Sequence, residues 1–116
     1  MAYSKDYSAR ILELLGTATP VRGKNMFGGL GIYGNELFFA LIDEDRLYFK
    51  VDDVSRKLFE AEGMGPFYPF EGADPMRGYY EVPKRVLEDL EELKVWVDQA
   101  LGVAERAKKS KPRKKS

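Results

Sequence analysis

Apolar residues recur at helical spacing near the start of the chain, with charged residues between them. The apolar positions are Tyr7, Ile11, Leu14 and Ala18. Separations of three and four residues place these side chains on one face of a helix, which has about 3.6 residues per turn. The pattern predicts an amphipathic first helix over residues 4–15, and Gly16 is expected to end it, because glycine commonly follows the last helical turn.

From residue 25 onward the pattern changes to the period of two that is typical of β-strands. Three runs rich in aliphatic and aromatic residues cover 25–34, 36–42 and 46–51, and short polar segments separate them. The segment before them, 19–24, is expected to be a connector. Strands joined by such short polar turns form hairpins, so the three runs predict an antiparallel meander.

Alternation along the third run predicts the two faces of the sheet. Leu47, Phe49 and Val51 would face one side, and Arg46, Tyr48 and Lys50 the other. A sheet with such strands has one dry face and one that is wet or occupied.

The rest of the chain predicts helices and strands in alternation. The expected elements are a short helix over 52–63 capped by Asp52 or Asp53, a short strand within 67–70, a strand over 77–82, a short helix after Pro83, and a final helix from Asp89 in which Asp89 and Glu92 have capping-box spacing. The order is helix, three strands, helix, one or two strands, helix. Helices on one face of an antiparallel sheet give a two-layer α+β sandwich.

The charge of the chain is sharply divided. Seven of the 19 basic residues lie in 106–116, and all 19 acidic residues precede them, so residues 1–105 carry a formal charge of −7 and the remainder +7. We therefore expect one folded domain over 1–105 and a disordered basic tail over 106–116. The basic residues of the tail are Arg106, Lys108, Lys109, Lys111, Arg113, Lys114 and Lys115. They would either contact nucleic acid without regard to sequence or serve as a solubilising extension.

The stretch "GLGIYG", residues 29–34, matches the glycine fingerprint of dinucleotide-binding proteins. That fingerprint works where a strand ends in the glycine turn and a helix begins, because the helix N-terminus then faces the pyrophosphate. Here the glycines are followed by another predicted strand. We interpret Gly28, Gly29 and Gly31 as residues that allow a bulge or close packing, and Gly34 as the turn.

The amino-acid composition excludes most of the side chains that enzymes use for catalysis. The chain contains no cysteine and no histidine, which excludes thiolate nucleophiles and the commonest general base and metal ligand. Its paired carboxylates fall in a predicted turn and at predicted helix starts, where acids favour turns and offset the helix dipole. These pairs are Asp43 with Asp45, Asp52 with Asp53, and Glu91 with Glu92. We therefore expect no enzyme, and no catalytic, cofactor-binding or metal-binding residue.

No segment approaches the roughly 20 apolar residues of a membrane span, and the first ten residues lack the apolar core of a signal peptide. We expect a soluble cytoplasmic protein without membrane contact.

One face of the predicted sheet is left for a partner. Tyrosines and cations would line it: Arg46, Tyr48, Lys50, Arg77 and Tyr79. An uncovered sheet face is solvated, paired with a second copy or bound to another protein. We therefore expect a homodimer or an unidentified protein partner at this face or at an edge strand of the sheet.

Several motifs together resemble a known family. These are "MFGG" at 26–29, "LYFKVD" at 47–52, "YYEVP" at 79–83, and the final helix with Leu93, Trp96 and Ala100. Their order and spacing resemble the N-terminal domain of the TfoX (Sxy) competence regulators, over residues 7–107, as in a stand-alone N-terminal domain.

The resemblance implies an α+β fold of the secretion-chaperone-like kind. It also implies a regulatory or adaptor domain without known enzymatic activity that acts through protein contacts. Direct, sequence-independent nucleic-acid binding through the basic tail is the alternative function.

Overall fold

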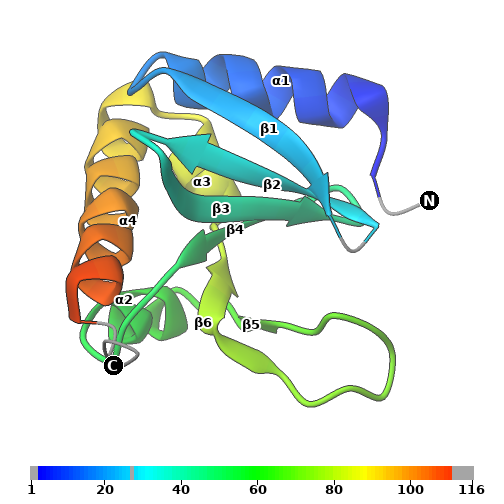
Figure 1. Ribbon diagram of the computed structural model, residues 1–116, viewed down its shortest axis with the longest axis vertical. Helices are drawn as coiled ribbons and strands as arrows, with labels where there is room; N and C mark the ends of the chain where they lie inside the picture. The colour runs from blue at the N-terminus through cyan, green and yellow to red at the C-terminus, as the bar shows by residue number, and fades with distance from the viewer. Residues whose placement is uncertain (1–2, 27, 111–116) are drawn as a thin grey trace, which may run out of the picture.

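The computed structural model describes residues 3–26 and 28–110. These residues form one antiparallel sheet of six strands together with four helices (Figure 1). The strands are β1 (Val21–Met26), β2 (Gly29–Gly34), β3 (Leu37–Asp43), β4 (Arg46–Lys50), β5 (Pro66–Phe67) and β6 (Met76–Glu81). The helices are α1 (Lys5–Gly16), α2 (Ser55–Ala61), α3 (Lys84–Leu87) and α4 (Leu90–Ser110). The predicted two-layer α+β fold is confirmed.

The sheet has the spatial order β1-β2-β3-β4-β6-β5, so β1 and β5 form its edges. The expected single strand over 25–34 is wrong, because residues 21–26 form β1, which pairs with β2 in a hairpin. Gly28 lies in the connecting turn with a φ of 78°, a left-handed conformation that glycine adopts without steric cost. A glycine-rich stretch therefore makes two strands and a reversal where one strand and a connector were expected.

The next two hairpins turn on non-glycine residues. Asn35 and Glu36 join β2 to β3 with φ values of 53° and 62°, and Glu44 and Asp45 join β3 to β4 with values of 52° and 56°. Two successive positive φ values are those of a type I′ turn, whose twist suits adjacent strands. The turn expected at Gly34 therefore lies one residue later, since Gly34 is already paired with Leu37.

The glycine motif shapes the sheet. A Cβ added to Gly29 would lie 2.5 Å from the backbone oxygen of Ile42 in the neighbouring strand, so only glycine permits this approach. A bulge is present, but in β3: the pairing changes from Ile32 with Ala40 to Tyr33 with Phe38, which leaves Phe39 as the extra residue. The motif runs from one strand to the next, as the sequence predicted, without a helix after the glycines.

The helices cover one face of the sheet and enclose one main core. α4 lies across β3 and β4, and α1 packs on β1 and α4 (Figure 1). Phe39, Phe49 and Tyr80 from the sheet and Trp96 and Val97 from α4 belong to this core. Among the described residues, no helix lies against the opposite face, which we call the open face.

Side-chain caps start two of the helices, and the cap at Asp52 was predicted from the sequence. The Ser4 hydroxyl accepts a hydrogen bond from the Tyr7 backbone N–H at 3.1 Å at the start of α1. Asp52 accepts from the backbone of Val54 and Ser55 before α2, at 3.1 and 2.8 Å. These bonds satisfy N–H groups that have no partner within the helix.

α4 is capped by Asp89, which accepts from the backbone N–H groups of Glu91 and Glu92 at 3.1 and 3.2 Å. The reciprocal half of a capping box is not formed, because the Glu92 carboxylate turns toward Trp96 and Arg85. α4 also continues to Ser110, so residues 106–110 are helical where the sequence predicted a disordered tail. Arg106 and Lys109 form ion pairs from these last turns.

Candidate protein-binding face

The open face carries a second, smaller apolar cluster. Leu41, Tyr48, Phe67 and Tyr79 are buried there, and Phe38 packs against them. Its aromatic rings form contacts across the sheet, with centroids 5.7 Å apart for Phe38 and Tyr79 and 5.0 Å apart for Tyr48 and Phe67. Side chains that cover each other in this way hold the open face together without a helix.

Four of the five predicted partner-face residues meet on this side of the sheet. Lys50 pairs in register with Tyr79, and its ammonium lies 4.8 Å from the ring centroid and 3.4 Å from the hydroxyl. Arg46 reaches Glu81 at 3.4 Å, and Glu81 is the register partner of Tyr48. The alternation along β4 therefore correctly predicted which side chains share the open face.

Arg77 is placed elsewhere. The pairing of β5 with β6 shifts between Pro66 and Phe67, which interrupts the alternation along β6, and Met76 and Tyr79 come to line the same cavity. The Arg77 side chain instead interacts with the hydroxyl of Tyr80, whose ring belongs to the main core. Burial and the Glu60 carboxylate raise the pKa of Tyr80, and the Arg77 charge lowers it in part.

An apolar cavity of about 210 Å³ opens on this face. Its walls come from five strands and the loop after β5, and include Met26, Phe38, Leu41, Phe67, Met76 and Tyr79. The sequence analysis missed Met26, Phe67 and Met76 as site residues. Met26 and Phe67 lie in predicted strands and Met76 in a predicted loop, and only the pairing of β1 with β2 and of β5 with β6 brings them together.

Gly31 lies beneath this arrangement. A Cβ at this position would lie 2.6 Å from the Met26 methyl carbon and 3.0 Å from the Phe38 ring. The missing side chain therefore leaves the space that these two walls of the cavity occupy.

A second hollow of about 410 Å³ adjoins the apolar cavity and shares Asp43 and Pro69 with it. We call it the acidic hollow, because Asp43, Glu44 and Glu71 line it. Burial, and to a lesser degree the charge of Glu44, raises the pKa of Asp43. Burial and the Glu81 carboxylate raise the pKa of Tyr48, on the same wall, to about 12.

The loop between β5 and β6 projects from the molecule beside these hollows (Figure 1). It exposes large apolar side chains: Phe70 is 69% exposed, Tyr68 53% and Met76, at its far end, 42%. Single exposed apolar residues are common on protein surfaces, but several around an apolar cavity are typical of an interaction site.

A larger hollow of about 560 Å³ lies between α1 and α3. Its cations and carboxylates are balanced, with Arg10, Arg46 and Lys84 against Asp45, Glu81 and Glu88. Burial, with smaller contributions from Asp45 and Glu81, raises the pKa of Tyr7 at its edge. This hollow therefore offers no net charge to a partner.

The paired carboxylates have structural contacts. Asp52 caps α2, Asp53 pairs with Arg56 at 2.6 Å, and Asp45 accepts from the Ser4 backbone N–H at 2.7 Å. Within residues 3–26 and 28–110, no group of three or more carboxylates is arranged so that it could hold a metal ion.

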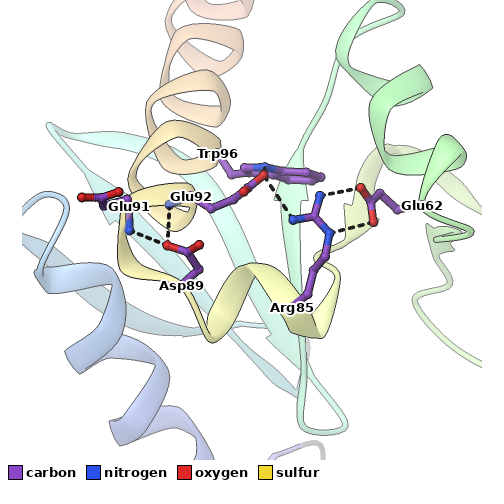
Figure 2. A network of polar contacts seen from close by, with 6 residues as sticks. All are labelled: Glu62, Arg85, Asp89, Glu91, Glu92 and Trp96. Atoms are coloured by element: carbon purple, nitrogen blue, oxygen red, sulfur yellow. Dashed lines mark hydrogen bonds and ion pairs between the residues drawn. The ribbon is translucent and has the colours of Figure 1, made fainter.

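A polar network joins three helices on the covered side of the sheet (Figure 2). Arg85 of α3 donates to both oxygens of Glu62, at 3.0 and 2.5 Å, and lies 3.3 Å from the Glu92 carboxylate of α4. Glu62 follows the end of α2, and Glu92 also accepts from the Trp96 indole at 3.1 Å. The Arg85 side chain therefore ties α2, α3 and α4 together.

The predicted nucleic-acid contacts are only partly described. Arg106 pairs with Asp52 at 3.2 Å and Lys109 with Glu105 at 3.4 Å, while Lys108 is exposed on the last turns of α4. Lys111, Arg113, Lys114 and Lys115 lie outside the described residues. Two of the three described cations are thus already paired with carboxylates.

None of the helices in the described part of the chain has the length and hydropathy of a membrane span. A comparison with curated proteins finds no match. The family model of the TfoX N-terminal domain matches residues 13–104. This match covers most of the chain and includes the strands that build the open face, and the protein therefore belongs to the TfoX N-terminal domain family.

Proposed function

We propose that this protein is a non-enzymatic regulatory or adaptor domain of the cytoplasm, which acts by binding another protein on its open face. The observation that carries the proposal is the apolar cavity, with exposed Tyr68, Phe70 and Met76 around it. An apolar surface of this kind gains free energy when a partner removes it from water.

The polar side chains of the protein favour a binding function over a catalytic one. Histidine and cysteine are absent from the sequence, and several carboxylates serve as caps or ion-pair partners. An enzyme would need an acid and a base set at different pKa values within reach of one substrate.

Site-specific photo-crosslinking in cells tests the proposal. A photoreactive phenylalanine replaces Met76 at the cavity or, as the control, Val95, which is 65% exposed on α4. We expect a discrete cross-linked species from position 76 and not from position 95. The same adducts from both positions, or none from position 76, would contradict binding at the open face.

Nucleic-acid binding is the second candidate. The last turns of α4 present exposed Lys108 at an end of the molecule, directly before the remaining basic residues of the sequence. Such a cationic end attracts phosphates independently of sequence, whereas the acidic remainder of the protein repels them. A salt titration that compares the full chain with a chain lacking residues 111–116 tests this candidate.

A further inference from the structure

This inference rests on the proposed function, which is protein binding at the open face. The side chains of that face indicate which class of partner would bind there. We infer that the open face binds an extended protein segment in which one large apolar side chain lies close to an arginine or lysine. The apolar side chain would enter the apolar cavity, and the cation would enter the acidic hollow.

The volume of the apolar cavity fits a single side chain. Apolar cavities of roughly 150 Å³ hold a benzene-sized group, whereas sites for cofactors and other small molecules usually measure about 300 to 1,000 Å³. The cavity here is about 210 Å³ and has almost only apolar atoms on its walls. Met26 and Met76 on those walls are unbranched and adjust to side chains of different shape. The cavity therefore suits a phenylalanine, leucine or similar side chain.

The acidic hollow favours a cation. Asp43, Glu44 and Glu71 line it, and none of them pairs with a cation in the part of the chain that the structure describes. Of the described residues, Arg46 is the one cation on its wall, and it is paired with Glu81. Burial already disfavours the charge of Asp43, so a cation from a partner would relieve an existing cost.

Exposed aromatic rings complete this hollow. Tyr68 and Phe70 stand on its wall and are more than half exposed. The face of an aromatic ring attracts ammonium and guanidinium groups, and the carboxylates beside it add to that attraction. The same carboxylates repel phosphate, which disfavours nucleic acid and anionic lipid at this face.

The two hollows share a wall, so one segment reaches both. Asp43 and Pro69 belong to each of them. Neighbouring residues of an extended segment project to opposite sides, and residues two apart to the same side, at a spacing of about 7 Å. The basic end of this chain, "AKKSKPRKKS", contains no large apolar side chain and does not meet the requirement.

Fluorescence anisotropy with three labelled peptides and the full chain tests the inference. The first peptide has a phenylalanine flanked at two-residue spacing by arginines, the second has alanine in place of the phenylalanine, and the third has glutamates in place of the arginines. We expect the first to bind, and each change to weaken binding roughly tenfold or more, as loss of a buried aromatic side chain or of a charge pair would. Equal binding of all three peptides, or no binding of the first, would overturn the inference.

Matched variants locate the binding. Glu44→Gln with Glu71→Gln removes two charges from the acidic hollow, and Glu36→Gln with Glu91→Gln removes two exposed charges elsewhere, one of them also in a hairpin turn. We expect the first pair to weaken binding of the arginine peptide at least fivefold and the second pair to change it less than twofold. Circular dichroism confirms that both remain folded. Equal effects of the two pairs would refute the acidic hollow as the site.

The outcome separates this inference from the proposed function. If photo-crosslinking at Met76 yields a discrete partner while the glutamate peptide binds as well as the arginine peptide, the open face is a binding site and the stated chemistry is wrong. If the variant Met76→Glu abolishes peptide binding and Val95→Glu does not, the apolar cavity is confirmed as the anchor. If neither the cross-link nor peptide binding is found, both proposals fail.

Discussion

The carboxylate of Glu92 accepts a hydrogen bond from the indole N–H of Trp96, one turn further along α4, at 3.1 Å. The same oxygen lies 3.3 Å from the guanidinium of Arg85 (Figure 2). The indole ring packs edge-on against Phe59, with centroids 4.7 Å apart. One carboxylate thus positions both a core side chain and the cation that links three helices. This dual contact explains why Glu92 does not complete the capping box with Asp89.

Replacing Trp96 tests how much of the core depends on this ring. Trp96→Ala removes a buried ring and should lower the free energy of unfolding by about 3 to 5 kcal/mol. Trp96→Phe keeps most of the packing and loses the N–H donor, so a cost of about 1 to 2 kcal/mol is expected. Urea denaturation followed by far-ultraviolet circular dichroism measures both, since Trp96 is the one tryptophan in the sequence. Equal stability of wild type and Trp96→Ala would show that the ring is not a core element.

The ion pair between Arg85 and Glu62 makes stability depend on pH. Hydrogen bonds from Arg85 hold the pKa of Glu62 below its usual value. A carboxylate with a lowered folded-state pKa contributes stability above its unfolded pKa, near 4.3, and loses that contribution as the pH falls through the folded value. Arg85→Gln should therefore be less stable than wild type at neutral pH, and the difference should shrink below about pH 4.

Denaturation of the two proteins at neutral and acidic pH measures this difference. Lys94→Gln is a suitable control, because it removes an exposed cation that pairs with Asp98 within α4 alone. If the difference in stability between wild type and Arg85→Gln stays constant with pH, the ion pair between Arg85 and Glu62 is not its cause.

The glycines of β2 should tolerate substitution unequally. Gly29→Ala brings a Cβ within 2.5 Å of a backbone oxygen in β3, so the strands must separate and a loss of about 1 to 3 kcal/mol is expected. Gly31→Ala meets the flexible end of Met26, which can move, so the loss should be smaller. Thermal unfolding of the two variants gives the comparison. If Gly31→Ala were the more harmful, the close approach at Gly29 would not be what requires glycine there.

Removal of residues 111–116 tests the nucleic-acid candidate. This segment contains four of the basic residues, and each phosphate contact contributes roughly 0.9 to the slope of log affinity against log salt concentration. If the tail binds a generic DNA duplex, the shortened chain should bind more weakly, with a slope reduced by about 3 to 4. Fluorescence anisotropy over a series of salt concentrations measures both quantities. Unchanged affinity and slope would exclude these residues as the contact.

The sequence predicted the elements whose signal is local. The first helix, the strands from Leu37 to Lys50 and the cap at Asp89 follow from apolar period and from the hydrogen-bonding capacity of single side chains. The same local signals correctly placed Tyr48 on the open face, because alternation along one strand decides it. The glycine motif was correctly excluded as a helix start for the same reason, since a strand follows it directly.

The other features depend on pairing between distant segments. A glycine-rich stretch is compatible with a strand, a bulge or a reversal, and only the pairing of Val21–Met26 with Gly29–Gly34 makes it a hairpin. The helical residues 106–110 are too polar to be predicted as packed, yet Arg106 reaches Asp52, which is 54 positions away in the chain. Sequence periodicity contains no information about such contacts.

What the sequence by itself determined was the two-layer fold, the family and the split of charge, because each follows from local patterns along the chain. The tertiary structure alone decided that Met26, Leu41 and Met76 enclose a cavity and that Asp43 joins it to an acidic hollow. Those residues come from separate strands, and their side chains meet only because the register of the sheet brings them to one place.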